Sequence, residues 1–483
     1  MGRLQATKDQ RIEKIKNLRK LGSDPFASSF NKKQTIKESR ELLEKDTQTA
    51  GRVMAVRGHG ALVFMDLVDE TGKIQLLLKQ ENLSDKENKV IALSDIGDFI
   101  GVSGKVITSK SDEISIEVAS FTLLTKSIRP LPSQWHGLKD VEERYRQRYL
   151  DLLLDDDLKE VFRRKAIFWQ SFRQFLLDKG FLEVETPVLE NTAGGADANP
   201  FVTHHDALDV DLYLRISIGE LWQKRLMVGG FERTFEIGRQ FRNEGISHEH
   251  LQDYTQMEFY WAYANYQDSM KLTEEMYKYV AKKTFNTLKF DINDHKVDLS
   301  GNWGEIDYAT TVLEKTGVDI TKATTNQLKD KLKELKIRYD TNSNKGRLID
   351  YLWKSIRKDI TGPVFLTGHP VEVSPLAKRK PENPDFVERF QIIIAGSEVG
   401  NGYSELNDPL DQEARFKEQE KAREAGDPEA QMHDKDFVRA LEYGMPPVSG
   451  FGVSERLFSF LANKSIRETV FFPLLRPEVK NKK

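Results

Sequence analysis

Two alternating segments joined by a short polar loop restrict the fold more than any other part of this sequence. Apolar and polar side chains alternate along residues 234–244, and they alternate again along residues 254–262, after the polar loop 245–253. A period of two is typical of a strand with one buried and one polar face. Two such strands around a short loop predict an antiparallel hairpin. Four polar side chains then share one sheet face: Arg242, Glu244, Glu258 and Tyr260.

This polar face has two interpretations. Charged residues near the centre of a half-buried sheet need partners of opposite charge or hydrogen bonds. A bound ligand provides such partners, and so does a purely structural network of ion pairs. Both hypotheses stay open on the hairpin alone.

A second polar cluster lies in residues 398–405, EVGNGYSE. Asn401 and Glu405 are four residues apart, so we expect a helical turn to bring them to one face. Gly400 and Gly402 permit such a turn.

A third cluster, residues 450–456 with the sequence GFGVSER, reads as a glycine-rich strand that opens into an apolar helix. An arginine at such a junction, here Arg456, can reach a phosphate group. The three clusters together predict a site that combines carboxylates with arginines.

The N-terminal 48 residues are expected to form a basic helical arm. Residues 1–20 hold seven Lys and Arg against two acidic residues, although the whole chain carries a net charge of −3. This asymmetry favours contact with a nucleic acid. An apolar stripe of Ile12, Ile15, Leu18 and Leu21 fits a helix with one solvated face equally well, and both interpretations can hold together.

Residues 49–128 are predicted to form a small β-barrel. Five short β-rich segments lie within about 80 residues, the spacing of an oligonucleotide-binding (OB) barrel. They are residues 53–56, 62–67, 74–78, 99–106 and 114–118. Another small barrel or sandwich has the same pattern.

The rest of the chain, residues 129–483, is predicted to be the second domain. A helix near 158–179 has a broad face of Phe162, Ala166, Trp169, Phe172 and Leu176, which suits burial in its own core or against a second subunit. Residues 263–362 are lysine-rich and mostly helical, and we assign no chemistry to them. The fold class is therefore α+β, with an all-β domain before a mixed one.

Composition excludes several kinds of site. The chain has no cysteine, which excludes disulfides, thiolate metal sites and a cysteine nucleophile, and a reducing cytoplasm is the simplest location. No stretch has the roughly 20 apolar residues of a membrane span. Neither G-x-x-x-x-G-K-[ST] nor G-x-G-x-x-G occurs, so any ATP site here uses another architecture.

The three clusters resemble the three signature motifs of class II aminoacyl-tRNA synthetases, and the whole chain is similar to the lysyl-tRNA synthetase family. The similar stretches are HGLKDVEERYRQRYLDL (136–152), FLEVETPVL (181–189), GGFERTFEIGRQFRNEG (229–245), HPVEVSPLAKR (369–379), EVGNGYSELNDP (398–409) and IRETVFFPLLRP (466–477). The resemblance implies an anticodon-binding OB domain, a catalytic antiparallel sheet flanked by helices, and a homodimer. It also implies tRNA(Lys), ATP and L-lysine as partners, with Mg²⁺ as cofactor.

The resemblance implies a role for each matching residue. Arg242, Glu244 and Arg456 are expected to be catalytic, and Glu398 is expected to hold the metal ion. The expected lysine-binding residues are Gly195, Glu220, Arg242, Glu258, Tyr260, Asn401 and Glu405. The expected ATP-binding residues are Arg242, Glu244, His250, Leu251, Tyr254, Glu398 and Arg456. The expected anticodon-binding residues are Arg57, Phe64, Gln75 and Glu113, although Phe64 also fits a plain core residue.

The chain departs from the family pattern at three places. Ile218-Gly219 precedes Glu220 where the family has a proline, with one extra residue, and the junction before Arg456 is one residue short. Gln391 stands where the family has a metal-binding glutamate, which leaves the number of bound ions open.

Two alternative functions remain. A related enzyme could attach lysine to a protein, but such enzymes lack the barrel. A non-catalytic RNA-binding paralogue would have no use for Arg242, Glu244, Glu398 and Arg456.

Overall fold

The computed structural model describes residues 2–59, 62–109, 112–132, 138, 140–245, 247, 250–341, 343–424, 426 and 429–478. The motif at 136–152 and the loop at 245–253 therefore lie partly outside the described residues. The described residues form two compact units, divided in the sequence between Arg144 and Tyr145.

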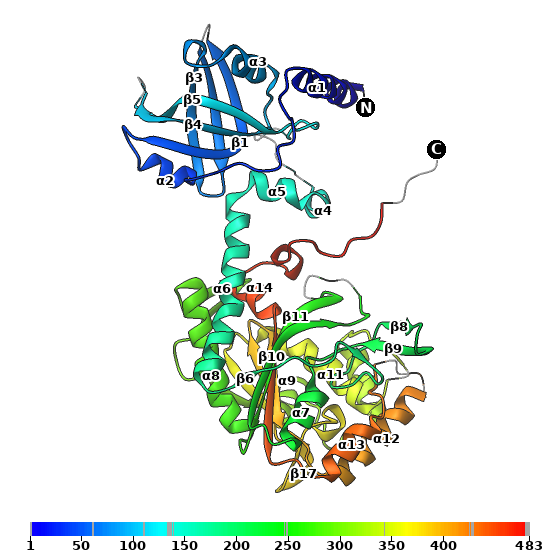
Figure 1. Cartoon of the computed structure of the whole chain (residues 1–483). Coiled ribbons are helices and arrows are strands. Elements are labelled where there is room, and N and C mark those ends of the chain that lie inside the picture. The colour runs from blue at the N-terminus through cyan, green and yellow to red at the C-terminus, as the bar shows by residue number, and fades with distance from the viewer. Residues whose placement is uncertain are drawn as a thin grey trace. The chain divides into compact units, whose positions relative to one another are not determined.

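The first unit is a closed five-stranded barrel with three helices (Figure 1). Its elements are α1 (Gly2–Lys20), α2 (Ile36–Arg40), β1 (Asp46–His59), β2 (Leu62–Asp69), β3 (Gly72–Lys79), η1 (Gln80–Asn82), α3 (Asp85–Leu93), β4 (Phe99–Thr108) and β5 (Ile114–Thr125), and α4 (Val141–Arg146) spans the division. The strand order is β1-β2-β3-β5-β4, which confirms the predicted OB-type barrel.

Strand β1 is longer than the sequence pattern predicts because it serves two neighbours. Its first half pairs with β4, from Asp46 opposite Lys105, and its second half pairs with β2, to His59 opposite Leu62. Inward-facing side chains such as Met65 and Leu67 are almost fully buried and fill the barrel. The β-rich segments therefore predicted the five strands but not their ends.

Helix α1 uses part of its positive charge inside its own unit. Ile15 and Leu18 are buried, as the apolar stripe predicts, whereas Ile12 is exposed. Arg11 is buried too, and its guanidinium donates to the carbonyl oxygens of residues 96, 127 and 129 at 3.1–3.2 Å. Lys14 pairs with Asp95 at 2.7 Å. The arm is thus a packed helix whose outer basic side chains face solvent.

The second unit is built on an eight-stranded sheet (Figure 1). Its helices are α5 (Arg148–Leu154), α6 (Asp156–Asp178), α7 (Glu220–Val228), α8 (Tyr266–Phe285), α9 (Tyr308–Thr316), α10 (Thr325–Glu334), α11 (Lys345–Ile356), α12 (Pro409–Glu424), α13 (Lys435–Glu442), α14 (Arg456–Leu461), and the short η2 (Arg357–Asp359), η3 (Val371–Val373) and η4 (Ile466–Thr469). Its strands are β6 (Leu182–Glu183), β7 (Leu189–Glu190), β8 (Val202–His205), β9 (Val210–Leu214), β10 (Arg233–Phe241), β11 (Asp253–Ala262), β12 (Lys289–Ile292), β13 (His295–Asp298), β14 (Gly304–Asp307), β15 (Val364–Thr367), β16 (Arg379–Lys380), β17 (Asn383–Val387), β18 (Arg389–Ile394), β19 (Ser397–Ser404) and β20 (Val448–Ser454).

The sheet has the order β14-β15-β18-β19-β20-β11-β10-β6. Its six central strands are antiparallel, as expected. The edge strands β14 and β6 run parallel to their neighbours, so the sheet is mixed. The predicted hairpin is β10–β11, with Phe241 opposite Asp253.

One face of this sheet packs against α6 and α8. Phe235, Phe259 and Phe451 from three adjacent strands join the aromatic side chains of these helices in one buried core. In α6 the buried face includes Phe168, whereas the predicted Ala166 is exposed. The alternate residues of the same strands point to the opposite face, where the polar side chains collect.

Candidate active site

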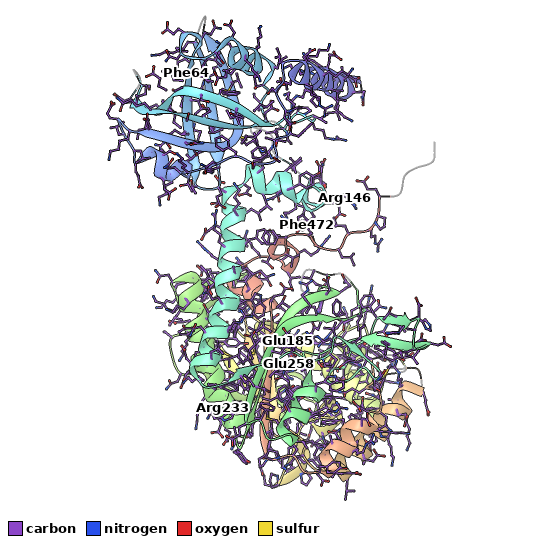
Figure 2. The ribbon with its side chains drawn as sticks, in the orientation of Figure 1. Phe64, Arg146, Glu185, Arg233, Glu258 and Phe472 are labelled. Carbon is purple, nitrogen blue, oxygen red and sulfur yellow. The ribbon has the colours of Figure 1, made fainter. Side chains whose placement is uncertain are left out.

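Cross-strand register places the polar side chains of five strands in two rows. The first row contains Glu236 (β10), Glu258 (β11), Gly452 (β20), Asn401 (β19) and Gln391 (β18). The second row contains Thr234, Tyr260, Gly450, Tyr403 and Arg389 from the same strands. Directly opposed residues project to the same face of a sheet. Residues far apart in the sequence therefore meet on one surface, on which Glu258 is labelled in Figure 2.

The predicted helical turn between Asn401 and Glu405 is wrong. Residues Ser397–Ser404 are strand β19, and Asn401 pairs with both Gln391 and Gly452. Residues four apart also share a face in a strand, because four is twice its period of two. The two residues thus face the same side for a reason other than the predicted one.

Gly450 keeps space open in the middle of the second row. A Cβ atom at this position would lie 2.6 Å from Cε1 of Tyr260 and would also overlap the carboxylate of Glu405. Any larger residue would displace both side chains. The glycine-rich segment therefore shapes the floor of the site as well as leading to Arg456.

The fourteen residues predicted for the catalytic domain line one cavity of about 950 Å³. They are Gly195, Glu220, Arg242, Glu244, His250, Leu251, Tyr254, Glu258, Tyr260, Gln391, Glu398, Asn401, Glu405 and Arg456. Both carboxylates and arginines line this cavity.

Glu258 is a buried carboxylate that accepts three hydrogen bonds. The donors are the backbone N–H of Ile218 at 2.9 Å, Nε2 of Gln256 at 2.6 Å and the hydroxyl of Tyr260 at 3.0 Å. Burial raises the pKa of Glu258 to about 7, and the negative charge of Glu220 adds to this effect. A cation in the cavity would restore the ionised form.

Lys224 is a site residue that the sequence analysis missed. Its Nζ atom lies 2.8 Å from Glu220 Oε1 and 2.5 Å from Glu405 Oε2, and the side chain is almost fully buried. Burial alone would lower the pKa of Lys224, but the charges of Glu220 and Glu405 reverse the effect and raise it, so the ammonium persists. The four-residue spacing of Glu220 and Lys224, which places both on one side of α7, is the feature of the sequence that could have indicated this ion pair.

At the position before Glu220, where the family has a proline, this chain has a glycine with a backbone conformation that proline cannot adopt. Gly219 has φ +63°, in the left-handed region, and a Cβ atom there would lie 2.8 Å from Cβ of Thr186. Proline, with φ near −65°, cannot adopt this conformation. Gly219 directly precedes α7 and so sets the direction in which Glu220 enters the cavity.

Arg242 and Arg456 also line the cavity. Nε of Arg242 donates to the carbonyl of Ile216 at 3.2 Å, and its Cζ lies 5.8 Å from the centre of the Tyr254 ring. Nη2 of Arg456, the first residue of α14, donates to Oγ of Ser397 at 3.3 Å. Two guanidinium groups facing one cavity suit a polyphosphate.

A buried ion pair fixes the backbone before Arg456, and the sequence analysis missed this pair as well. Glu455 is fully buried, and Lys165 of α6 pairs with its carboxylate and donates to the carbonyl of Thr469 at 2.8 Å. Oε1 of Glu455 accepts from the backbone N–H of Thr255 at 3.1 Å, and the Glu455 N–H donates to the Thr255 carbonyl at 2.9 Å. One side chain thus joins α6, β11 and the start of α14.

The polar face of the hairpin contains both a structural ion pair and a carboxylate that faces the cavity, so each of the two interpretations describes part of it. Glu236 forms a structural ion pair with Arg215 at 2.5 Å and accepts from the backbone of Thr186 at 3.1 Å. Glu258, its neighbour across the strands, lines the cavity. The same face therefore holds one internal ion pair and one carboxylate that is available to a ligand.

In the barrel unit, the predicted residues lie on β1, β2 and β3 or directly before β5, which are neighbouring strands. Arg57 pairs with Phe64 across β1 and β2, and Gln75 donates to Glu113 at 2.9 Å. Phe64, labelled in Figure 2, is half-buried and lies outside the barrel core. Met65 beside it is buried in that core. Phe64 is therefore not the plain core residue that the alternative required.

Comparisons with known proteins match both units. Residues 140–476 match the family described as tRNA synthetases class II (D, K and N), and residues 48–124 match the OB-fold nucleic acid binding domain. Proteins named lysine–tRNA ligase are 44% identical in Thermotoga sp. (strain RQ2), 45% in Carboxydothermus hydrogenoformans and 44% in Bacillus subtilis. These alignments cover 98%, 97% and 96% of this chain and 97%, 97% and 96% of the relatives. In the part of the chain that the structure describes, no helix is long and apolar enough to cross a membrane. The chain belongs to the lysine–tRNA ligases, within the class II tRNA synthetases.

Proposed function

We propose that this chain activates L-lysine with ATP and transfers it to the 3′ end of tRNA(Lys). The names of its relatives support this activity. The observation that carries the proposal is the pair of buried carboxylates, Glu258 and Glu405, in the same cavity as Arg242 and Arg456. A buried ammonium ion needs such carboxylates, and a triphosphate needs such arginines.

In the first step, an oxygen of the lysine carboxylate bonds to the α-phosphorus of ATP and pyrophosphate leaves with the bonding electrons. The nucleophile is already ionised, so positioning and charge neutralisation are sufficient. Arg242 is assigned to bridge the lysine carboxylate and the α-phosphate, and Arg456 to contact the γ-phosphate. In the second step, a 3′-terminal tRNA hydroxyl attacks the lysyl carbonyl and AMP leaves.

The remaining residues are assigned to recognition. Gly195 and Glu220 hold the α-amino group, and Glu258, Tyr260, Asn401 and Glu405 surround the ε-ammonium group. Glu244 holds the adenine amino group, Tyr254 stacks on the base, and His250 and Leu251 complete the ATP site. Their common position along one cavity supports this assignment.

Magnesium is part of the proposal, with Glu398 as its ligand. Glu398 is a half-exposed carboxylate at the cavity wall, which suits an ion that also takes water and phosphate oxygens. When bound, the ion would neutralise phosphate charge.

The barrel is proposed to bind the anticodon through Arg57, Phe64, Gln75 and Glu113. A half-buried aromatic ring beside hydrogen-bonding side chains is suited to single-stranded bases. A relative that modifies proteins would lack this barrel, and a non-catalytic RNA-binding paralogue would not need the catalytic cavity.

A homodimer and a cytoplasmic location complete the proposal. Support for the dimer comes from the exposed apolar side chains Leu177, Leu182, Val188 and Leu189 at and after the end of α6. Several exposed apolar residues in one segment favour a protein interface. Sedimentation of the purified protein tests this part.

The activity is tested by ATP–pyrophosphate exchange with each of the twenty amino acids. Lysine should support exchange, whereas arginine, aspartate and asparagine should hardly do so. Exchange with another amino acid, or none with lysine, would reject the assignment.

A further inference from the structure

Residues 263–362, to which no chemistry was assigned from the sequence, contribute basic side chains to the active-site cavity. Residues 263–362 include α11 and η2, and four basic residues of these two elements line the cavity: Arg347, Lys354, Arg357 and Lys358. Arg347 pairs with Glu429 and Lys354 pairs with Asp350, each at 2.7 Å. Arg357 differs from these two because its partner is Glu398, the carboxylate assigned to magnesium.

Arg357 lies close to Glu398 but does not form a hydrogen bond with it. Nη1 of Arg357 lies 3.7 Å from Oε2 of Glu398, beyond hydrogen-bond distance, and the Arg357 side chain is 15% exposed. Within the described residues, the Arg357 guanidinium donates no hydrogen bond. Its donors therefore remain available to a ligand in the cavity.

Arg456 approaches the same short stretch of β19. Its Nη2 atom donates to Oγ of Ser397, the residue before Glu398. Two guanidinium groups thus approach consecutive residues of one strand beside the proposed triphosphate site.

The donor set in this region fits one metal ion and not two. Gln391, in place of the family's glutamate, is buried and carries no charge. Among the described residues, no three His, Asp or Glu side chains lie close enough to form a metal site by themselves.

We propose that Arg357 is a further catalytic residue, which contacts the polyphosphate of ATP and provides the positive charge that a second metal ion would supply. This inference rests on the proposed function. A guanidinium group presents several N–H donors in a planar fork that matches phosphate oxygens. Glutamine at position 391 removes a ligand of the second ion. Arginine at position 357 then supplies the positive charge that this ion would have provided.

The role of Arg357 belongs to the activation step. As the lysine carboxylate bonds to the α-phosphorus, the bond from that phosphorus to the bridging oxygen breaks and its electron pair leaves with pyrophosphate. Arg357 and Arg456 then neutralise charge on the leaving group, and neither transfers a proton.

Binding measurements on the full-length protein test this proposal without turnover. The probes are α,β-methylene-ATP, whose bridging carbon prevents cleavage, and Mn²⁺ detected by electron paramagnetic resonance. Arg357→Gln should weaken binding of the analogue about 10- to 100-fold, the range of a lost charge-assisted contact. Arg357→Lys should restore part of this loss. Lys331→Gln is the matched control, because Lys331 lies on α10 of the same segment, pairs with Glu334 at 2.8 Å and is not among the residues that line the cavity, so the affinity should stay unchanged.

The metal count gives an independent measurement. The wild-type protein with the analogue and lysine should bind one tight Mn²⁺ ion, and Gln391→Glu should strengthen a second site. The same substitution should shift the magnesium dependence of exchange to lower concentrations, and identical curves would mean that residue 391 does not influence metal binding.

Two outcomes would overturn the role of Arg357. Unchanged binding of the analogue in Arg357→Gln would make the contact with Glu398 purely structural. Loss of tRNA charging with intact exchange and analogue binding would assign Arg357 to the tRNA end instead. Absence of lysine-dependent exchange in the wild type would reject the proposed function separately, because analogue binding is measured without it.

Discussion

The charge of Glu258 gives a direct test of the site, because stability and ligand binding should respond to its removal in opposite directions. Glu258 is 5% exposed, and burial together with the charge of Glu220 raises its pKa from 4.5 to about 7. Substitution with glutamine removes the charge while retaining the shape. Without ligand, Glu258→Gln should stabilise the protein at pH 8.

The sign follows from proton linkage. A pKa raised on folding means that the folded state binds the proton more tightly, so stability is highest below pH 4.5 and falls as the pH rises through about 7. At pH 8 this effect destabilises the wild type by about 3 kcal/mol. The glutamine variant carries no charge and so avoids this destabilisation. Its amide has one acceptor oxygen where the carboxylate has two, so one of the three donors loses its acceptor, at a cost of about 1 kcal/mol. The net stabilisation is about 2 kcal/mol at pH 8 and close to zero at pH 5.

Scanning calorimetry of the ligand-free protein measures the difference. For a unit of about 340 residues, 2 kcal/mol corresponds to an increase in unfolding temperature of about 3 °C. Lysine binding, measured by titration calorimetry at pH 8, should weaken by about 2–5 kcal/mol in the same variant. A lower unfolding temperature at pH 8, or equal shifts at both pH values, would refute the claim that Glu258 carries a buried charge that is not compensated.

Three further predictions concern other parts of the site. Glu405→Gln should weaken lysine binding by about 2–5 kcal/mol, and unchanged affinity by titration calorimetry would remove Glu405 from the pocket. Phe64→Ala should reduce tRNA charging by the equivalent of about 1–3 kcal/mol while exchange without tRNA stays intact; if both fall, the substitution has damaged the fold. Lys165→Met should lower the unfolding temperature and raise the KM for ATP more than the KM for lysine, because Glu455 directly precedes Arg456; equal changes in both KM values would contradict a positioning role.

Local periodicity was sufficient to predict the centre of the fold. The alternation along residues 234–262 predicted the pairing of β10 with β11 and the separation of Phe235 from Glu236. That separation follows from strand geometry alone, so no tertiary information was needed. The strand ends were less predictable, as in β1, because pairing with a second partner extends a strand beyond its apolar core.

The remaining site depends on contacts between distant segments. Lys165 and Glu455 are 290 residues apart, and neither stands in a pattern that signals the pair. Arg357 likewise lies in a lysine-rich helical region, where nothing in the local sequence distinguishes it from the other basic residues. Lys224 was the exception, since its spacing from Glu220 was visible in the sequence.

The charge balance of the pocket connects the missed lysine with substrate choice. Glu220, Glu258 and Glu405 place three carboxylates within one buried region, and Lys224 compensates one of them. Three unpaired buried carboxylates would repel one another, so the internal ammonium lowers the cost of placing them together. Two carboxylates remain for the ligand. On the proposed assignment, lysine provides two ammonium groups to these carboxylates and gives its own carboxylate to Arg242. Aspartate and asparagine bring only one ammonium group each, which would leave a buried carboxylate without a partner.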